Sequence, residues 1–131
     1  MAKSKLLTKK DVQKILSQTS VQGKRMIFKS PDLPVGILEN KDAVNDAEVH
    51  KKEGDLWHCL EGEVKFVYGG ELVDEWAAKD MEGNGNPNEL RAKAISNGTE
   101  VVLKSGDWLW IPPGEPHQHS GTGKLVIIKI S

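Results

Sequence analysis

The stretch Gly106-Asp-Trp-Leu-Trp-Ile-Pro-Pro-Gly-Glu-Pro-His-Gln-His119 combines a short apolar run, a turn rich in proline and glycine, and two histidines spaced two residues apart. Alternate side chains of a β-strand point to the same face. His117 and His119 therefore point the same way if the chain returns to a strand after residues 114–116. Two imidazoles on one face of a β element form a candidate metal site, because neutral imidazole is a common metal ligand.

A second segment, Glu48-Val-His-Lys-Lys-Glu-Gly-Asp-Leu-Trp-His-Cys-Leu-Glu-Gly62, carries matching polar residues. Its metal-capable side chains are Glu48, His50, Glu53, Asp55 and His58. All four histidines of the chain fall in these two segments. A single histidine is as often a hydrogen-bonded structural residue or a solvent-facing one. The division of all four between two short segments favours a shared site instead.

Length and composition describe a single ordinary domain. The chain has 131 residues, 37% of them hydrophobic and 28% charged, with a net charge of -1. This balance supports neither nucleic-acid binding nor membrane binding. Cys59 is the only cysteine, which excludes an internal disulfide. No run approaches the roughly 20 apolar residues of a membrane span, and Leu6-Leu7 is too short for a secretory signal. We therefore expect a cytoplasmic protein.

The N-terminal part predicts one amphipathic helix. Thr8 and Asp11 have the spacing of a capping box, and apolar residues follow at helical spacing over about 9–19. Gly23 is expected to mark the end of this helix. The pattern divides the chain into a helix with its lead-in, residues 1–23, and a β domain, residues 24–131.

Short β-like runs follow one another after Gly23. They cover 25–29, 35–39, 44–50, 56–60, 63–68, 71–73, 90–95, 99–104, 107–111 and 125–130. Gly69-Gly70 predicts a hairpin into the run at 71–73. Residues 74–89 are irregular and predict a long loop, which could gate a binding mouth. Roughly eight to ten short strands with frequent turns indicate an all-β sandwich or barrel.

The segment 106–119 resembles the second signature motif of the cupin superfamily. That motif runs Gly, five residues, Pro, one residue, Gly, two residues, His, and it is matched by Gly106, Pro112, Gly114 and His117. Gly121 stands at the position where the family's motif closes with an asparagine. The match extends over roughly residues 34–130. It implies a jelly-roll β-barrel and the homodimeric assembly that is usual in the family.

The upstream segment resembles a variant of the first cupin motif. Asp55 and Gly62 match its acidic ligand and closing glycine, with aspartate in place of glutamate. His50 falls at the second histidine of the family's pair, and Glu48 falls at the first. The resemblance implies that His50, Asp55 and His117 bind a divalent metal ion, with Glu48 as a fourth ligand or as a group that orients one. Iron, manganese, nickel and zinc can all use such ligands.

Two histidines keep alternative roles. In an unbroken strand Asp55 and His58 point to opposite faces, so only one of them is the ligand near His117 unless a bulge shifts the register. Asp55 is the favoured choice. His119 shares the face of His117 and could ligate or act as a general base. The alternative for His119 is an edge position in solvent.

The aromatic residues and arginines indicate what lines the barrel cavity and what it could bind. Trp57 is expected on the Asp55 face, and either Trp108 and Trp110 or their neighbours in the strand line the barrel. The only arginines are Arg25 and Arg91. A guanidinium from either one in the cavity would favour a carboxylate substrate, and the alternative is that both lie on the surface at strand ends. The leading hypothesis is a metal-dependent enzyme acting on a small polar or carboxylate-bearing molecule, with dioxygenase, isomerase and lyase chemistry all open. The alternative is a non-catalytic ligand-binding or sensing module.

Overall fold

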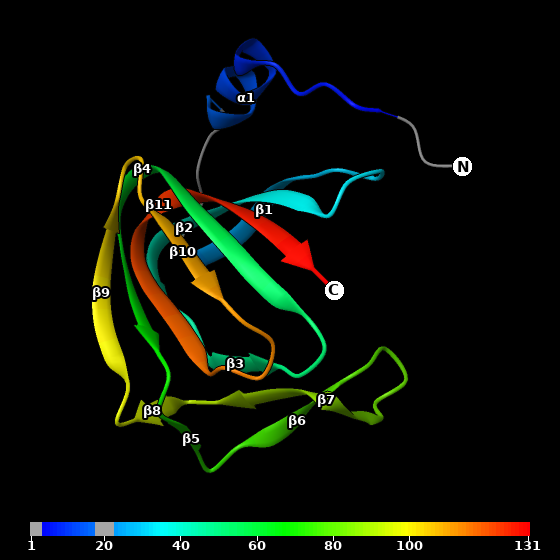
Figure 1. Cartoon of the computed structure of the whole chain (residues 1–131), viewed down its shortest axis with the longest axis vertical. Helices are drawn as coiled ribbons and strands as arrows, with labels where there is room; N and C mark the ends of the chain where they lie inside the picture. The colour runs from blue at the N-terminus through cyan, green and yellow to red at the C-terminus, as the bar shows by residue number, and fades with distance from the viewer. Residues whose placement is uncertain (1–3, 18–22) are drawn as a thin grey trace.

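The structure, a computed structural model, describes residues 4–17 and 23–131, and these form one helix followed by antiparallel strands that curve around a common interior (Figure 1). The elements in chain order are α1 (Lys9–Leu16), β1 (Gly23–Lys29), β2 (Val35–Val44), β3 (Ala47–His50), β4 (Gly54–Tyr68), β5 (Glu71–Val73), β6 (Trp76–Lys79), β7 (Gly85–Ala92), β8 (Ala94–Ser96), β9 (Thr99–Lys104), β10 (Trp108–Ile111) and β11 (His117–Ile130). The predicted all-β architecture with one N-terminal helix is confirmed.

The two long strands β4 and β11 organise the barrel. They pair antiparallel from His117 opposite Tyr68 to Ile130 opposite Gly54. The other edge of β11 pairs with β2 and β3, and the other edge of β4 pairs with β9 and β10. The histidine-bearing start of β11 therefore lies directly beside β3, whose Glu48 pairs with His117. This register brings the two segments singled out in the sequence together.

Strand β4 runs through Gly62 without ending there. Sequence analysis predicts two separate runs, 56–60 and 63–68, but they form one strand of 15 residues. Gly62 has a φ of 80° and pairs with Gly123 of β11, and the β4–β11 register shifts close by, between Lys124 and Leu125. An added Cβ would lie 2.5 Å from the carbonyl oxygen of Thr122. Glycine at this position therefore allows the strand to continue through a left-handed backbone conformation and a close approach to β11.

The core consists of apolar side chains from the strands around β4 and β11. Its buried members are Leu38, Trp57, Cys59, Val64, Phe66, Leu103, Ile111, Leu125 and Ile127. In β10 the Ile111 side chain is buried and Leu109 packs against the core, while Trp108 and Trp110 are exposed. The non-tryptophan set therefore lines the barrel. Burial of each large apolar side chain contributes about 1.5–3 kcal/mol.

The predicted hairpin at Gly69-Gly70 is wrong. Strand β5 pairs with β8 rather than with β4. The reason is that Tyr68, the last residue of β4, already pairs with Thr99 on one edge and with His117 on the other. Because both edges of β4 are occupied at this end, β5 cannot pair with it. The chain leaves the main sheet after Gly69, and β5 pairs with β8 instead.

The predicted long loop over 74–89 is also wrong, because most of it forms a hairpin of β6 and β7. The Asp80 carboxylate accepts hydrogen bonds from the backbone N–H groups of Glu82 and Asn84, which closes the turn. The register between the strands shifts between Ala77 and Ala78. Strand β7 also pairs with β3, so it is held on both edges. This hairpin lies beside the end of the barrel that holds β3 (Figure 1).

Helix α1 begins with the predicted capping box. The Thr8 hydroxyl accepts from the Asp11 N–H, and the Asp11 carboxylate accepts from the Thr8 N–H. The helix ends at Leu16 with Ser17 as its C-cap, and the predicted end at 19 lies outside the described residues. Gly23 is the first residue of β1 and does not cap the helix. Among the described residues, no helix has the length and apolar character needed to span a membrane.

Candidate metal centre

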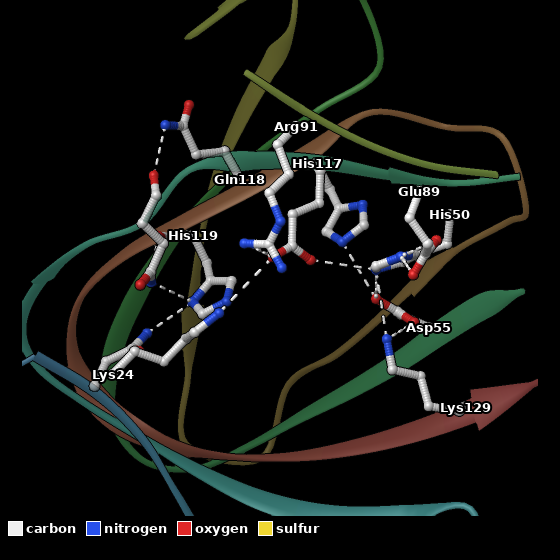
Figure 2. A network of polar contacts seen from close by, with 12 residues as sticks. Lys24, His50, Asp55, Glu89, Arg91, His117, Gln118, His119 and Lys129 are labelled. Carbon is white, nitrogen blue, oxygen red and sulfur yellow. Dashed lines mark hydrogen bonds and ion pairs between the residues drawn. The ribbon is translucent and has the colours of Figure 1, made fainter. Parts of the chain in front are cut away.

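Four polar side chains converge inside the barrel from three neighbouring strands. Glu48 and His50 come from β3, Asp55 from the start of β4, and His117 from the start of β11. Figure 2 shows Asp55, His50 and His117 pointing toward one another. Asp55 and His117 are only 1% and 2% exposed. Ionisable groups buried to this extent need partners, so their mutual arrangement decides what the cluster can do.

The distances within the cluster suit ligands that share one centre. Asp55 Oδ2 lies 3.2 Å from His117 Nε2 and 3.4 Å from His50 Nε2. Glu48 Oε2 lies 3.3 Å from His50 Nε2. One ligand atom from each of Glu48, His50 and His117 lies within 4.8 Å of the other two. Glu48, His50 and His117 thus present ligand atoms to one small space, and the Asp55 carboxylate lies against the two imidazoles.

Hydrogen bonds on the far side of each ring fix the direction of its lone pair. His50 Nδ1 lies 2.8 and 2.9 Å from the two carboxylate oxygens of Glu89. His117 Nδ1 lies 3.3 Å from the carbonyl oxygen of Glu115. Because both partners only accept, both Nδ1 atoms carry a hydrogen and donate it. Both Nε2 atoms then face the cluster, which is the arrangement of metal-binding imidazoles oriented by an outer acceptor.

Two buried atoms of the cluster lack a conventional partner. Within the described residues, Asp55 Oδ2 and His117 Nε2 have no hydrogen-bond partner despite lying 3.2 Å apart. A carboxylate oxygen and an imidazole lone pair repel each other unless a proton or a cation lies between them. A divalent ion would satisfy both atoms at once. The donor set of this cluster therefore fits a metal.

The ionisable side chains of the cluster shift one another's pKa values. Burial alone would lower the pKa of His50, but the Asp55 and Glu48 carboxylates raise it to about 10. Burial alone would raise the pKa of Glu48, but His50, Lys24 and Arg91 lower it to about 2. Asp55 likewise has a pKa below its usual range because His117, His50 and Lys129 outweigh its burial. Without a metal the cluster therefore holds a proton on His50 between ionised carboxylates.

Sequence reasoning missed Lys129, which contacts the same cluster from β11. Its Nζ lies 2.7 Å from Asp55 Oδ1 and 3.4 Å from His50 Nε2. Figure 2 shows its ammonium directed at the Asp55 carboxylate. A sequence signal was available, because Lys129 has the same strand parity as the buried Leu125 and Ile127. A lysine on the inward face of an apolar strand indicates a buried partner.

The structure keeps His58 apart from the cluster. Its side chain lies on the outer face of β4, stacked on Trp108 with ring centroids 3.8 Å apart. Its Nδ1 lies 3.2 Å from the carbonyl oxygen of Asp107. The alternation of β4 turns Asp55, Trp57 and Cys59 inward and His58 outward. The placement of His58 follows from the same parity that brings Asp55 to His117.

His119 is buried beside the cluster, so the solvent-facing alternative for it is wrong. Its Nδ1 lies 2.8 and 3.1 Å from the side-chain amide nitrogens of Asn40 and Asn45. Burial lowers the pKa of His119 to about 3, so the ring is neutral at physiological pH. Because two N–H donors face Nδ1, the ring hydrogen lies on Nε2. This tautomer disfavours a general-base role and leaves Nε2–H as a hydrogen-bond donor.

A pocket of about 220 Å³ opens next to the cluster, over the neighbouring strands β3, β7 and β6. Glu48, His50, Glu89 and Arg91 line its inner side, and Ala78 to Asp80 of the hairpin line the other. Arg91 Nη1 lies 3.4 Å from Glu48 Oε1. The segment predicted as a gating loop is therefore an ordered wall of this pocket. The pocket thus provides space for a small ligand directly beside the candidate metal centre.

Comparisons with known proteins place the fold. No family model and no curated protein match the sequence. Hydroquinone 1,2-dioxygenase PnpCD, solved with Cd²⁺ and 4-hydroxybenzonitrile, superposes with a TM-score of 0.54 at 13% identity, over 91% of this chain and 69% of that one. Hydroquinone 1,2-dioxygenase from Sphingomonas sp. TTNP3, solved with 4-hydroxybenzoate, gives 0.51 at 11% identity, over 98% and 81%.

The Drosophila melanogaster CENP-C cupin domain gives a TM-score of 0.50 at 13% identity and covers 77% of this chain. This chain spans only 59% of that domain's length. Together the three likenesses confirm the predicted cupin fold. At identities of 11–13% they extend to the fold alone.

Proposed function

We propose that this chain, which has the cupin fold, is a metal-dependent enzyme acting on a small polar or carboxylate-bearing molecule. His50, His117, Asp55 and Glu48 would hold the divalent ion. One observation carries the proposal: two imidazole Nε2 atoms, each oriented by an acceptor on its Nδ1 side, face the buried and unpartnered Asp55 Oδ2.

The donor set suits first-row metals. Imidazole nitrogen with carboxylate oxygen is compatible with iron, manganese, nickel and zinc, and it is not the all-oxygen environment that Mg²⁺ and Ca²⁺ prefer. When bound, such an ion supplies Lewis acidity and acidifies bound water. Glu89 would hold the His50 ring in its ligating tautomer from outside the centre. His119 would contribute a neutral ring and an Nε2–H donor next to the reacting space.

The pocket argues for a small substrate with an anionic group. Its volume of about 220 Å³ is below the roughly 300 Å³ at which pockets for drug-sized ligands begin. Arg91 lines it with a side chain that is 44% exposed, and its guanidinium has further donors for a ligand beyond its contact with Glu48. A guanidinium binds a carboxylate through two parallel hydrogen bonds. A substrate carboxylate at Arg91 would lie at the inner wall of the pocket, beside Glu48 and His50.

The second candidate function is a non-catalytic ligand-binding barrel. Lys129 favours it, because an ammonium 2.7 Å from Asp55 already supplies positive charge to the carboxylate. In this alternative the pocket would bind a ligand without a metal. The homodimer and the cytoplasmic location remain predictions from the sequence under either function.

Metal content separates the two functions. The full chain, purified without chelators and also after incubation with metal salts, is analysed for iron, manganese, nickel, copper and zinc beside His117→Ala. We expect near one metal ion per wild-type chain and a substoichiometric amount in the variant. Equal metal content in both proteins would exclude this centre. Absence of metal from the reconstituted wild type would leave the ligand-binding barrel.

A further inference from the structure

Lys129 is placed at the centre by the β4–β11 register. It lies directly opposite Asp55 in the ladder, one residue before the last pair, which is Ile130 with Gly54. Its backbone N–H donates to the carbonyl oxygen of Pro34 at 2.8 Å, which anchors this part of β11 to the start of β2. The lysine is therefore presented to Asp55 by a fixed backbone, and its contact with the carboxylate is a built feature of the barrel.

The two oxygens of Asp55 have different partners. Oδ1 accepts from Lys129 Nζ at 2.7 Å, while Oδ2 faces His117 and His50. With Oδ1 engaged by the ammonium, only Oδ2 is free to ligate. The carboxylate is therefore divided between an internal cation and the candidate metal position.

We propose that Lys129 is a built-in competitor of the metal, one that restricts Asp55 to a single ligating oxygen and weakens metal affinity. This inference rests on the proposed metal function. The ammonium lies 3.4 Å from His50 Nε2, an atom that the metal would bind. A divalent ion at this centre and the ammonium would thus be close like charges in a poorly hydrated space, where their repulsion is strong.

The contacts of Lys129 also provide a way to relieve this repulsion. Its side chain is 33% exposed, and its Nζ lies 3.7 Å from Glu53 Oε1. Glu53 is itself 35% exposed, on the solvent side of the lysine. When a metal takes Asp55, the ammonium can move toward Glu53 and water. When the metal leaves, the ammonium returns to Asp55 and again compensates the charge of the carboxylate. The centre would therefore bind its metal reversibly.

The test measures metal affinity by calorimetric titration of the metal-free full chain with Zn²⁺ and with Mn²⁺ at one pH. Lys129→Met removes the charge at similar length, and Lys129→Arg retains it. Lys65→Met is the matched control, because Lys65 is an exposed lysine of β4 that pairs with Glu100. We expect Lys129→Met to bind metal about tenfold tighter or more than the wild type. Lys129→Arg should stay close to the wild type, and Lys65→Met should equal it.

The outcomes separate this inference from the proposed function. Unchanged or weaker affinity in Lys129→Met, with normal metal binding by the wild type, overturns the competitor role and leaves the metal function standing. Binding by Lys129→Met but not by the wild type supports the competitor role and overturns the metal function of the natural chain. Binding by neither overturns both. Thermal unfolding of each variant identifies a protein that has lost its fold. In that case Lys129→Gln, which also removes the charge, replaces Lys129→Met, and affinity no tighter than that of the wild type overturns the competitor role.

Discussion

Asp55 and His117 face each other inside the barrel with Oδ2 and Nε2 3.2 Å apart, although they stand at opposite ends of the β4–β11 ladder, opposite Lys129 and Tyr68. Neither atom has a hydrogen-bond partner among the described residues. Strand β11 also pairs with β3, which sets His117 beside Glu48. The contact is thus a product of sheet topology, and the metal hypothesis depends on it.

Exchange of the Asp55 carboxylate for an amide is the direct test of this contact. We expect Asp55→Asn to lower metal affinity by at least about tenfold, because a neutral amide oxygen replaces a charged ligand. His58→Ala should keep wild-type affinity, because His58 stacks on Trp108 on the outer face. Metal titration of both variants provides the measurement. Loss of metal in His58→Ala with retention in Asp55→Asn would reverse our assignment.

Glu89 should matter although it lies outside the ligand set. Its carboxylate accepts from His50 Nδ1, and we expect Glu89→Ala to weaken metal binding by about 10- to 100-fold. Glu100→Ala is the control, since Glu100 forms an exposed ion pair with Lys65 on another part of the barrel. Affinities from competition with a chelator would compare the two. Equal affinity in both variants would mean that Glu89 does not orient His50.

Strand alternation accounts for most of what the sequence could predict. The alternation of residues 55–60 correctly favoured Asp55 over His58 as the inward residue, and the spacing of 117 and 119 correctly placed both histidines on one face. The glycine and proline spacing around His117 correctly indicated the fold. These patterns are local, since each depends only on the period of one strand.

The errors arose where a partner lies far away in the sequence. Glu89 reaches His50 only because β7 pairs with β3, and the segment 81–88 has the composition of a loop. Its strands form because the Asp80 side chain closes the turn. The pairing of β5 with β8 follows from edges of β4 that are already occupied. A local sequence pattern does not show which strand edges are already occupied, so it cannot predict such pairings.

Gly54 should be intolerant of even a small side chain. A Cβ at this position would overlap the Trp110 ring, which covers the glycine from the neighbouring strand β10. We expect Gly54→Ala to reduce the free energy of unfolding by about 1–3 kcal/mol through overpacking. Urea denaturation monitors the loss. In a Trp110→Leu background the same change should have a smaller effect, because the overlapping ring is gone; an equal effect in both backgrounds would assign the loss to the backbone instead.

The burial of His119 predicts acid sensitivity of the metal-free protein. Its pKa is about 3 in the folded state, against 6.5 for an unperturbed histidine, because burial disfavours the imidazolium. Between these values the unfolded chain binds more protons than the folded one. The free energy of unfolding therefore falls as the pH falls below about 6.5, by up to about 1.4 kcal/mol per pH unit from this residue.

Other groups of the centre leave a window in which this effect can be isolated. The pKa of His50 is raised to about 10, so its contribution is complete below pH 6.5 and is lost only as the pH rises toward 10. Asp55 and Glu48 have lowered pKa values, so their contributions decline only near and below pH 4. Urea unfolding of metal-free protein from pH 6.5 to 4.5 should therefore show a slope that His119→Gln reduces. The same slope in both proteins would show that His119 is not held neutral by burial.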